Sequence, residues 1–128
     1  MKTVLVVVVV IAVCTGTAQA QNAAAGEQVF KRLCLPCHDV GPGAKIKLGP
    51  PLNGIDSRKA GTFEGYSYSQ ANKTSGITWN EQSFSSYIRA PMQVIPDTKM
   101  AFVGIKDDKD IADLWAFLKQ FGPDGDKK

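Results

Sequence analysis

The chain has 128 residues, of which 44% are hydrophobic and 21% are charged, and it carries a formal net charge of +3. This balance is typical of one small globular domain and excludes a disordered or fibrous chain. The charge is also too small to indicate a nucleic-acid partner, and we expect none.

The N-terminal residues have the pattern of an export signal. Met1-Lys2 supplies a positive start, residues 4–13 are an uninterrupted apolar run, and Ala18-Gln19-Ala20 fits a signal peptidase site. The apolar run is too short to span about 30 Å of hydrocarbon as a helix, which disfavours a membrane anchor. We therefore predict that residues 1–20 are cleaved and that residues 21–128 form one periplasmic domain without stable membrane insertion.

Cleavage would change the charge and the cysteine content of the protein. Loss of Lys2 lowers the formal charge from +3 to +2, and loss of Cys14 leaves Cys34 and Cys37 as the remaining cysteines. Retention of Cys14 as a lipidated first residue is disfavoured, because Val13 is bulkier than the residue that normally precedes such a cysteine.

Three segments of the mature chain show the apolar spacing of helices. The first covers residues 26–33 and ends in a stripe of Val29, Phe30 and Leu33. The second begins after Asn80, a good N-cap residue, and ends before Pro91. The third begins near Asp107 or Asp108 and closes at Gly122-Pro123.

The segments between these helices are rich in glycine and proline. Residues 39–51, 54–65 and 92–104 are predicted to be loops, and a short helical turn is weakly indicated at residues 71–74. No strand periodicity is evident, so we expect an all-α core over about residues 26–120. Residues 124–128 are predicted to form a frayed polar tail.

The motif Cys34-Leu35-Pro36-Cys37-His38 follows the first helix. Each thiol can add to one vinyl group of a haem, and the imidazole can then reach the iron from one face. An exported Cys-x-x-Cys can instead form a redox disulfide, but the adjoining His38 and the absence of thioredoxin-like strand and helix alternation disfavour that reading. We interpret the motif as the attachment site of one haem c, held through Cys34 and Cys37.

The second axial ligand must come from elsewhere in the chain. His38 is the only histidine, which excludes two histidine ligands and leaves Met92, Met100 or a lysine. A loop methionine is more often core filler than a ligand, but the haem and the scarcity of alternatives favour Met100. Its loop lies between the last two helices and could bring the sulfur over the haem face opposite His38.

So small a helical chain buries too little apolar surface to hold long loops in place by side-chain packing alone. We expect the haem to supply the missing core, and the haem-free chain to be largely unfolded. The residues expected around the macrocycle are Phe30, Leu33, Trp79, Tyr87, Phe102, Leu114 and Leu118.

Further motifs follow the haem attachment site in a fixed order. Together they resemble class I cytochromes c of the mitochondrial cytochrome c and bacterial cytochrome c2 type, over about residues 26–120. The resemblance implies a small cytochrome c fold, with three main helices, short helical turns and long loops around one covalently bound haem. The motifs are Leu48-Gly49-Pro50, residues 54–61 with Arg58-Lys59, Ala71-Asn72-Lys73, Gly76-Ile77-Thr78-Trp79, Pro96-Asp97-Thr98-Lys99-Met100 and Phe102-Val103-Gly104-Ile105-Lys106.

The same resemblance implies a role for each matching residue. The Pro50 carbonyl would orient His38, and the first and last helices would cross where Gly26 and Phe30 meet Leu114 and Phe117. The resemblance further implies that Arg58, Tyr68 and Trp79 bind the haem propionates, that Asn72, Tyr87 and Thr98 form a polar network beside Met100, and that Phe102 packs on the haem. Taken singly, Arg58 could be a solvated loop residue and the aromatic residues ordinary core.

Two departures from the family pattern bear on function. Asp97 stands where the family usually has glycine, which puts the local turn geometry in doubt. Several haem-edge lysines of mitochondrial relatives are absent, with Leu33, Met92 and Gln93 at matching positions. Lys45, Lys47, Lys99 and Lys106 remain, so we expect docking with weaker electrostatic steering.

The sequence therefore predicts a soluble single-haem electron carrier with iron ligands His38 and Met100, and not an enzyme. Compatible partners are a cytochrome bc complex, a terminal oxidase, a photosynthetic reaction centre or a periplasmic dehydrogenase. The alternative is a haem peroxidase or ligand-binding sensor, which would require that Met100 be displaceable.

Overall fold

A computed structural model describes residues 20–128, and this part of the chain is helical, with no strand longer than an isolated bridge. The expected export signal lies outside the described residues except for Ala20. The all-α prediction is confirmed. In chain order the helices are α1 (Ala23–Leu33), α2 (Gln70–Thr74), α3 (Glu81–Arg89), α4 (Pro91–Val94) and α5 (Asp108–Leu118).

Helix α1 begins three residues before the predicted start at Gly26. The side chain of Asn22 caps it by accepting hydrogen bonds from the backbone N–H groups of Ala24 and Ala25, at 3.0 and 3.1 Å. Alanines have the highest helix propensity, so a capped alanine run is readily helical. The predicted turn at residues 71–74 is present as α2, which is capped by Ser69.

Helix α3 follows its prediction closely. Asn80 and Ser83 form a reciprocal capping box at its start, and the helix ends at Arg89 before Pro91. The expectation that residues 92–104 form an uninterrupted loop is wrong in its first part. Pro91 also begins α4, because proline suits the first position of a helix, where no N–H is needed.

Helix α5 is capped by Asp107 as predicted, but it ends at Leu118, before Gly122-Pro123. The residues that follow are not frayed. The N–H of Gly122 donates to the carbonyl of Asp126 at 2.8 Å, and Phe121 pairs with Lys127 in an antiparallel bridge. Backbone hydrogen bonds thus fold the tail back on itself, which its polar composition did not indicate.

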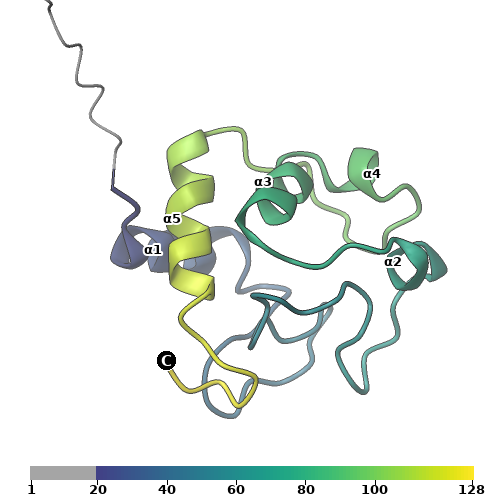
Figure 1. Ribbon diagram of the computed structural model, residues 1–128, viewed down its shortest axis with the longest axis horizontal. Coiled ribbons are helices and arrows are strands. Elements are labelled where there is room, and N and C mark those ends of the chain that lie inside the picture. Colours follow the sequence, from purple (N-terminus) through teal and green to yellow (C-terminus); the bar gives the residue numbers. More distant parts are fainter. Residues whose placement is uncertain (1–19) are drawn as a thin grey trace, which may run out of the picture.

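Helices α1 and α5 cross at close range (Figure 1). A Cβ atom at Gly26 would lie 1.9 Å from the Asp113 carbonyl oxygen, so the crossing requires glycine at this position. The rings of Phe30 and Phe117 pack with centroids 5.5 Å apart, and Leu114 is completely buried. The predicted crossing is therefore present, and its side chains fill the space between the helices.

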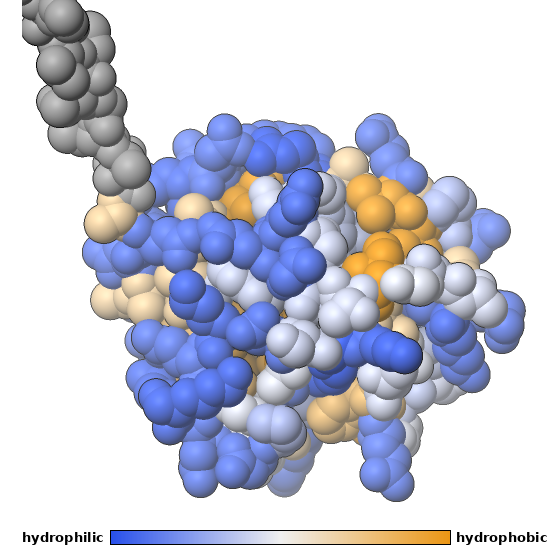
Figure 2. All heavy atoms as spheres, viewed as in Figure 1, coloured by the Kyte–Doolittle hydropathy of each residue, from blue (hydrophilic) through white to orange (hydrophobic). Residues whose placement is uncertain are grey.

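The surface is mostly hydrophilic in the view of Figure 2, with hydrophobic atoms gathered beside α4. Met92 of that helix is 57% exposed, and Val94 is also exposed. Within residues 20–128, no helix combines the length and the apolar character needed to cross a membrane.

Candidate functional site

A cavity of about 440 Å³ lies among α1, α3, α5 and the loops. Its volume is within the usual range of ligand pockets, about 300–1,000 Å³. The twelve residues predicted to bind the cofactor or the iron all line it. These are Cys34, Cys37, His38, Pro50, Arg58, Tyr68, Asn72, Trp79, Tyr87, Thr98, Met100 and Phe102.

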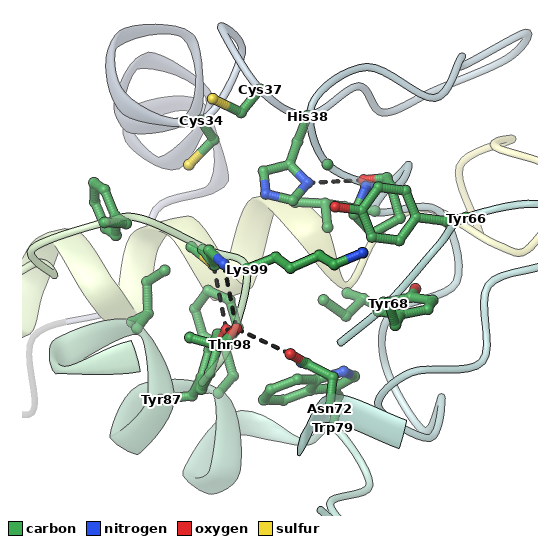
Figure 3. Close-up of a pocket in the computed structure, with 18 of the residues that line it drawn as sticks. Cys34, Cys37, His38, Tyr66, Tyr68, Asn72, Trp79, Tyr87, Thr98 and Lys99 are labelled. Atoms are coloured by element: carbon green, nitrogen blue, oxygen red, sulfur yellow. Dashed lines mark hydrogen bonds between the residues drawn. The ribbon is translucent and has the colours of Figure 1, made fainter. Parts of the chain in front are cut away.

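The two cysteines lie on one wall of the cavity (Figure 3). A tight turn holds them, because the N–H groups of Cys37 and His38 both donate to the Cys34 carbonyl, at 3.0 and 2.8 Å. Both thiols are free, and burial, together with the neighbouring Cys37, raises the pKa of Cys34 to about 12.

His38 lies beside these thiols with a fixed ring orientation. Its Nδ1 is 2.8 Å from the Pro50 carbonyl, which can only accept, so Nδ1 carries the hydrogen and Nε2 keeps its lone pair. Burial lowers the pKa of His38, against the opposing effect of the Pro50 hydrogen bond. The imidazole is therefore neutral at pH 7, as a metal ligand must be.

Gly49 contributes to this wall in a way that the sequence did not reveal. A Cβ atom there would lie 2.3 Å from His38 Cε1, so a larger residue would force the ring out of place. The Gly49 N–H donates to the Cys37 carbonyl at 2.8 Å, which ties the loop to the haem-attachment turn.

The opposite wall carries the expected polar network of Asn72, Tyr87 and Thr98 (Figure 3), and Met100 lines the cavity beside it. The Thr98 hydroxyl donates to Asn72 Oδ1 at 2.9 Å and lies 3.1 Å from the Tyr87 hydroxyl. That hydroxyl is 3.5 Å from Met100 Sδ, and burial raises the pKa of Tyr87. Asp97 adopts the left-handed conformation, with φ of +67°, so it supports the turn where the family usually has glycine.

Arg58 brings a partly buried positive charge to the cavity. Its guanidinium donates to the carbonyls of Asn53, at 2.8 Å, and Pro51, at 3.2 Å. Burial lowers its pKa, and within residues 20–128 no carboxylate pairs with it. Partial burial of an unpaired cation is unfavourable, and an anion bound in the cavity would offset it. Tyr68, whose hydroxyl oxygen accepts from the Phe63 N–H at 3.2 Å, also lines the cavity.

The aromatic lining differs from the prediction at one residue. Trp79 and Tyr87 pack with ring centroids 5.0 Å apart, and both line the cavity as expected. Phe30 was expected against the macrocycle, which is wrong. It packs on Phe117 within the helix crossing, as the family resemblance implied.

Two hydrogen bonds between loop segments, which the sequence did not predict, close the cavity. The Tyr66 hydroxyl donates to the Leu48 carbonyl at 2.8 Å, and its ring packs edge-on against Tyr68. Lys99 Nζ donates to the Ser67 carbonyl at 2.6 Å, and Figure 3 shows its side chain extended across the cavity. The one available signal was the alternation of tyrosine and serine at residues 66–69. Such alternation places Tyr66 and Tyr68 on the same side of an extended backbone.

The four lysines proposed for docking are not equally free. Lys47 Nζ donates to the Leu35 carbonyl at 3.0 Å, and Lys106 Nζ donates to the Arg89 carbonyl. Lys99 is tied to Ser67. Lys45 is exposed, and its side chain makes no hydrogen bond or ion pair within residues 20–128.

The donor set fits a haem attached on one side and ligated from both. Two thiols and the free Nε2 of His38 line the cavity on one wall, a thioether lines it on the other, and a partly buried guanidinium can pair with an anionic substituent. An all-α domain with such a cavity is a haem c protein.

The chain belongs to the cytochrome c family, since the cytochrome c family model matches residues 23–122. It is 57% identical over 119 residues to cytochrome c2 of Blastochloris viridis, covering 93% of each chain. It is 56% identical to a cytochrome c2 of Rhodoplanes tepidamans, over 84% of this chain and all of that one. Cytochrome c of Cannabis sativa is 48% identical, over 77% of this chain and 89% of that one. The resemblance to the cytochrome c2 type is confirmed: the protein is a haem-containing electron-transport protein with one covalently attached haem c.

Proposed function

We propose that this protein carries single electrons between periplasmic and membrane redox proteins, with His38 and Met100 as the two iron ligands. The observation that carries the proposal is the placement of these side chains on opposite walls of one cavity, each with its own hydrogen-bonding support. The haem, when bound, supplies an Fe(III)/Fe(II) couple that gains or loses one electron.

The residues of the cavity have distinct tasks in this proposal. Pro50 holds the His38 ring with Nε2 toward the iron and increases its basicity. Met100 supplies a neutral, soft sulfur, which favours the reduced state. Arg58 and Tyr68 bind anionic substituents of the haem, and the packed aromatic residues exclude water. Little therefore has to move when the electron is transferred.

Export is part of the same proposal. Cleavage after Ala20 would release residues 21–128 as one periplasmic domain, and the described residues are compatible with this because their first helix begins just beyond, at Ala23. Peptide mass spectrometry of the protein purified from the periplasm would identify Gln21, open or cyclised, as the first residue. A first residue at Met1, or at Cys14, would contradict it.

Docking is proposed at the haem edge through Lys45, Lys47, Lys99 and Lys106. The partner would be a cytochrome bc complex, an oxidase, a reaction centre or a dehydrogenase. The small formal charge expected of the mature chain, +2, supports weak steering. We expect electron-transfer rates with purified membranes to fall only modestly as salt rises, and rates wholly unaffected by salt would remove the lysines from docking.

A redox titration of the haem-loaded protein tests the proposed carrier function. We expect one reversible one-electron transition at positive potential, and no binding of carbon monoxide to the reduced protein, because both axial positions are filled. Rapid carbon monoxide binding, or turnover of peroxide, would favour the alternative of a sensor or peroxidase with a displaceable Met100.

A further inference from the structure

The last eight residues of the chain form a compact feature that we call the C-terminal hook, residues 121–128. Its own backbone is closed by hydrogen bonds from Gly122 N–H to the Asp126 carbonyl, at 2.8 Å, and from Gly125 N–H to the Gly122 carbonyl, at 3.0 Å. Lys128 N–H also returns to the Gln120 carbonyl at 2.8 Å. The hook is therefore an ordered part of the domain.

The hook lies against residues 39–54, which we call the proximal loop because it carries Pro50, the partner of His38. Figure 1 shows the yellow hook beneath α5, beside this loop. Gly54 N–H donates to the Phe121 carbonyl at 3.1 Å. At Gly125 the contact is so close that a Cβ atom would lie 2.2 Å from the Gly41 carbonyl oxygen. Both ends of the proximal loop thus rest on the hook.

Asn53 connects the hook to the haem side of the proximal loop. Its buried amide accepts from the Gly41 N–H at 2.7 Å and donates to the Gly41 carbonyl at 2.9 Å, which clamps the two ends of the loop together. A Cβ atom at Gly125 would lie 2.7 Å from the Asn53 amide nitrogen, so the hook packs directly on this clamp. The Asn53 backbone carbonyl in turn receives the guanidinium of Arg58 at 2.8 Å.

The path from Asn53 to His38 is short and stiff. Pro50 and Pro51 have ring-fixed φ angles, and Pro51 is fully buried. Arg58 bridges the carbonyls of Pro51 and Asn53, and Leu52 N–H donates to the Asp39 carbonyl at 2.9 Å. A displacement at Asn53 is therefore passed to the Pro50 carbonyl instead of being absorbed between them.

We propose that the C-terminal hook is a positioning element for His38, acting through the Asn53 clamp and the Pro50 carbonyl. The proximal loop has no regular secondary structure of its own, so its conformation depends on what it packs against. The hook supplies that support on the side away from the cavity. The proposal rests on His38 being the iron ligand of the proposed function.

The chain offers a matched pair of glycines with which to test this. Gly125 and Gly76 both have left-handed backbones, with φ of +88° and +71°, so alanine strains both positions similarly. A Cβ atom at Gly125 collides with the proximal loop, whereas one at Gly76 has nothing within 4 Å. Any difference between Gly125→Ala and Gly76→Ala therefore reports the contact between the hook and the loop.

The experiment is amide hydrogen exchange on the reduced, haem-loaded protein, together with exchange of the His38 Nδ1 proton by nuclear magnetic resonance. For Gly125→Ala we expect the Gly41 and Gly54 amides and the His38 Nδ1 proton to exchange about tenfold faster than in Gly76→Ala. The amides of α1 should exchange equally in both variants. A chain ending at Gly122 should reproduce the effect, and it serves as the test if Gly125→Ala does not fold.

Equal exchange at His38 Nδ1 in Gly125→Ala and Gly76→Ala would overturn the proposal, as would a truncated chain that exchanges like the full-length protein. Faster exchange confined to the hook would overturn it too, since the hook would then be a dispensable tail. Failure of the underlying function would look different, because the full-length protein itself would then not cycle between oxidation states.

Discussion

At the crossing of α1 and α5, side chains of the chain fill the space between two helices, whereas the walls of the cavity are mostly loop segments. Gly26 lets the helix backbones approach, and Phe30 packs on Phe117. Around the cavity, by contrast, residues from the loops between the helices face inward, and the hydrogen bond from the Tyr66 hydroxyl to the Leu48 carbonyl joins two parts of these loops. The first region is completed by amino acids alone, and the second is completed by the haem.

The two regions should therefore respond differently to loss of the cofactor. A domain of this size has little stability to spare, and the loops pay a large conformational entropy cost when ordered. The helix crossing can form with contacts made within the chain. The loops gain most of their apolar contacts from the macrocycle, so they should lose their order first.

The largest effect is expected when haem attachment is abolished. The double variant Cys34→Ala, Cys37→Ala should lose cooperative folding, a change comparable to the whole stability of a small domain, about 5–15 kcal/mol. Far-ultraviolet circular dichroism and thermal melting measure it. The double variant Gln82→Ala, Ser86→Ala, with both changes on the exposed face of α3, is the control. A native helical spectrum with cooperative melting in the cysteine variant would show that the loops keep their order without the haem.

The helix crossing can be broken on its own by Gly26→Ala. The added Cβ would meet the Asp113 carbonyl oxygen at 1.9 Å, so the helices must separate. Overpacking of this kind costs about 3 kcal/mol. Denaturant unfolding of the haem-loaded protein measures the loss, and Gln28→Ala, an exposed change on the same helix, is the control. Unchanged stability would mean that the crossing does not hold the domain.

A smaller effect is expected from the buried carboxylate of the crossing. Asp113 is 2% exposed, pairs with Lys109, and accepts from the Asn22 N–H at 2.7 Å. Burial acts to raise the pKa of Asp113, but these hydrogen bonds outweigh it, so the pKa lies below the ordinary value of 3.8. Asp113→Asn keeps an acceptor and removes the charge, which should cost about 1.5 kcal/mol at pH 7.

The pH dependence of this variant gives the prediction its sign. A lowered folded pKa stabilises the protein fully above the unfolded value, and the contribution is lost as the pH falls through the folded pKa. The difference in unfolding free energy between the wild type and Asp113→Asn should therefore be constant above about pH 5 and shrink below about pH 4. A difference that grows in acid would contradict the role of the charge.

The sequence was most informative where chemistry requires particular residues at particular spacings. The haem-attachment motif and the ordered motifs after it contain ten of the twelve predicted site residues, all but Tyr68 and Tyr87, and all twelve line the cavity. Local signals were nearly as useful, since Asn80 and Asp107 cap the helices expected of them. The prediction of a frayed tail rested on the polar composition of residues 124–128 and was wrong. Backbone hydrogen bonds within the C-terminal segment hold these residues in place.

Contacts between distant loops could not be read from the sequence. Nothing in the local pattern of Lys99 or Tyr66 says which carbonyl each will meet, because that depends on how three loops are stacked. Two partners were expected for Phe30, the macrocycle and Phe117, because an apolar stripe fits both, and Phe117 is the one that it contacts. Helical periodicity indicates which face of an element is buried. The tertiary fold determines which element or group covers that face.

The claim that His38 and Met100 hold the iron is tested most directly by the absorption spectrum of the oxidised protein. Met100→Ala should lose the far-red band of sulfur-ligated haem, and its potential should fall on the order of 0.2 V, well within the ~0.8 V that axial ligands span. Met92→Ala, which changes a methionine that is 57% exposed, should keep both. Persistence of the band in Met100→Ala, or its loss in Met92→Ala, would contradict the assignment.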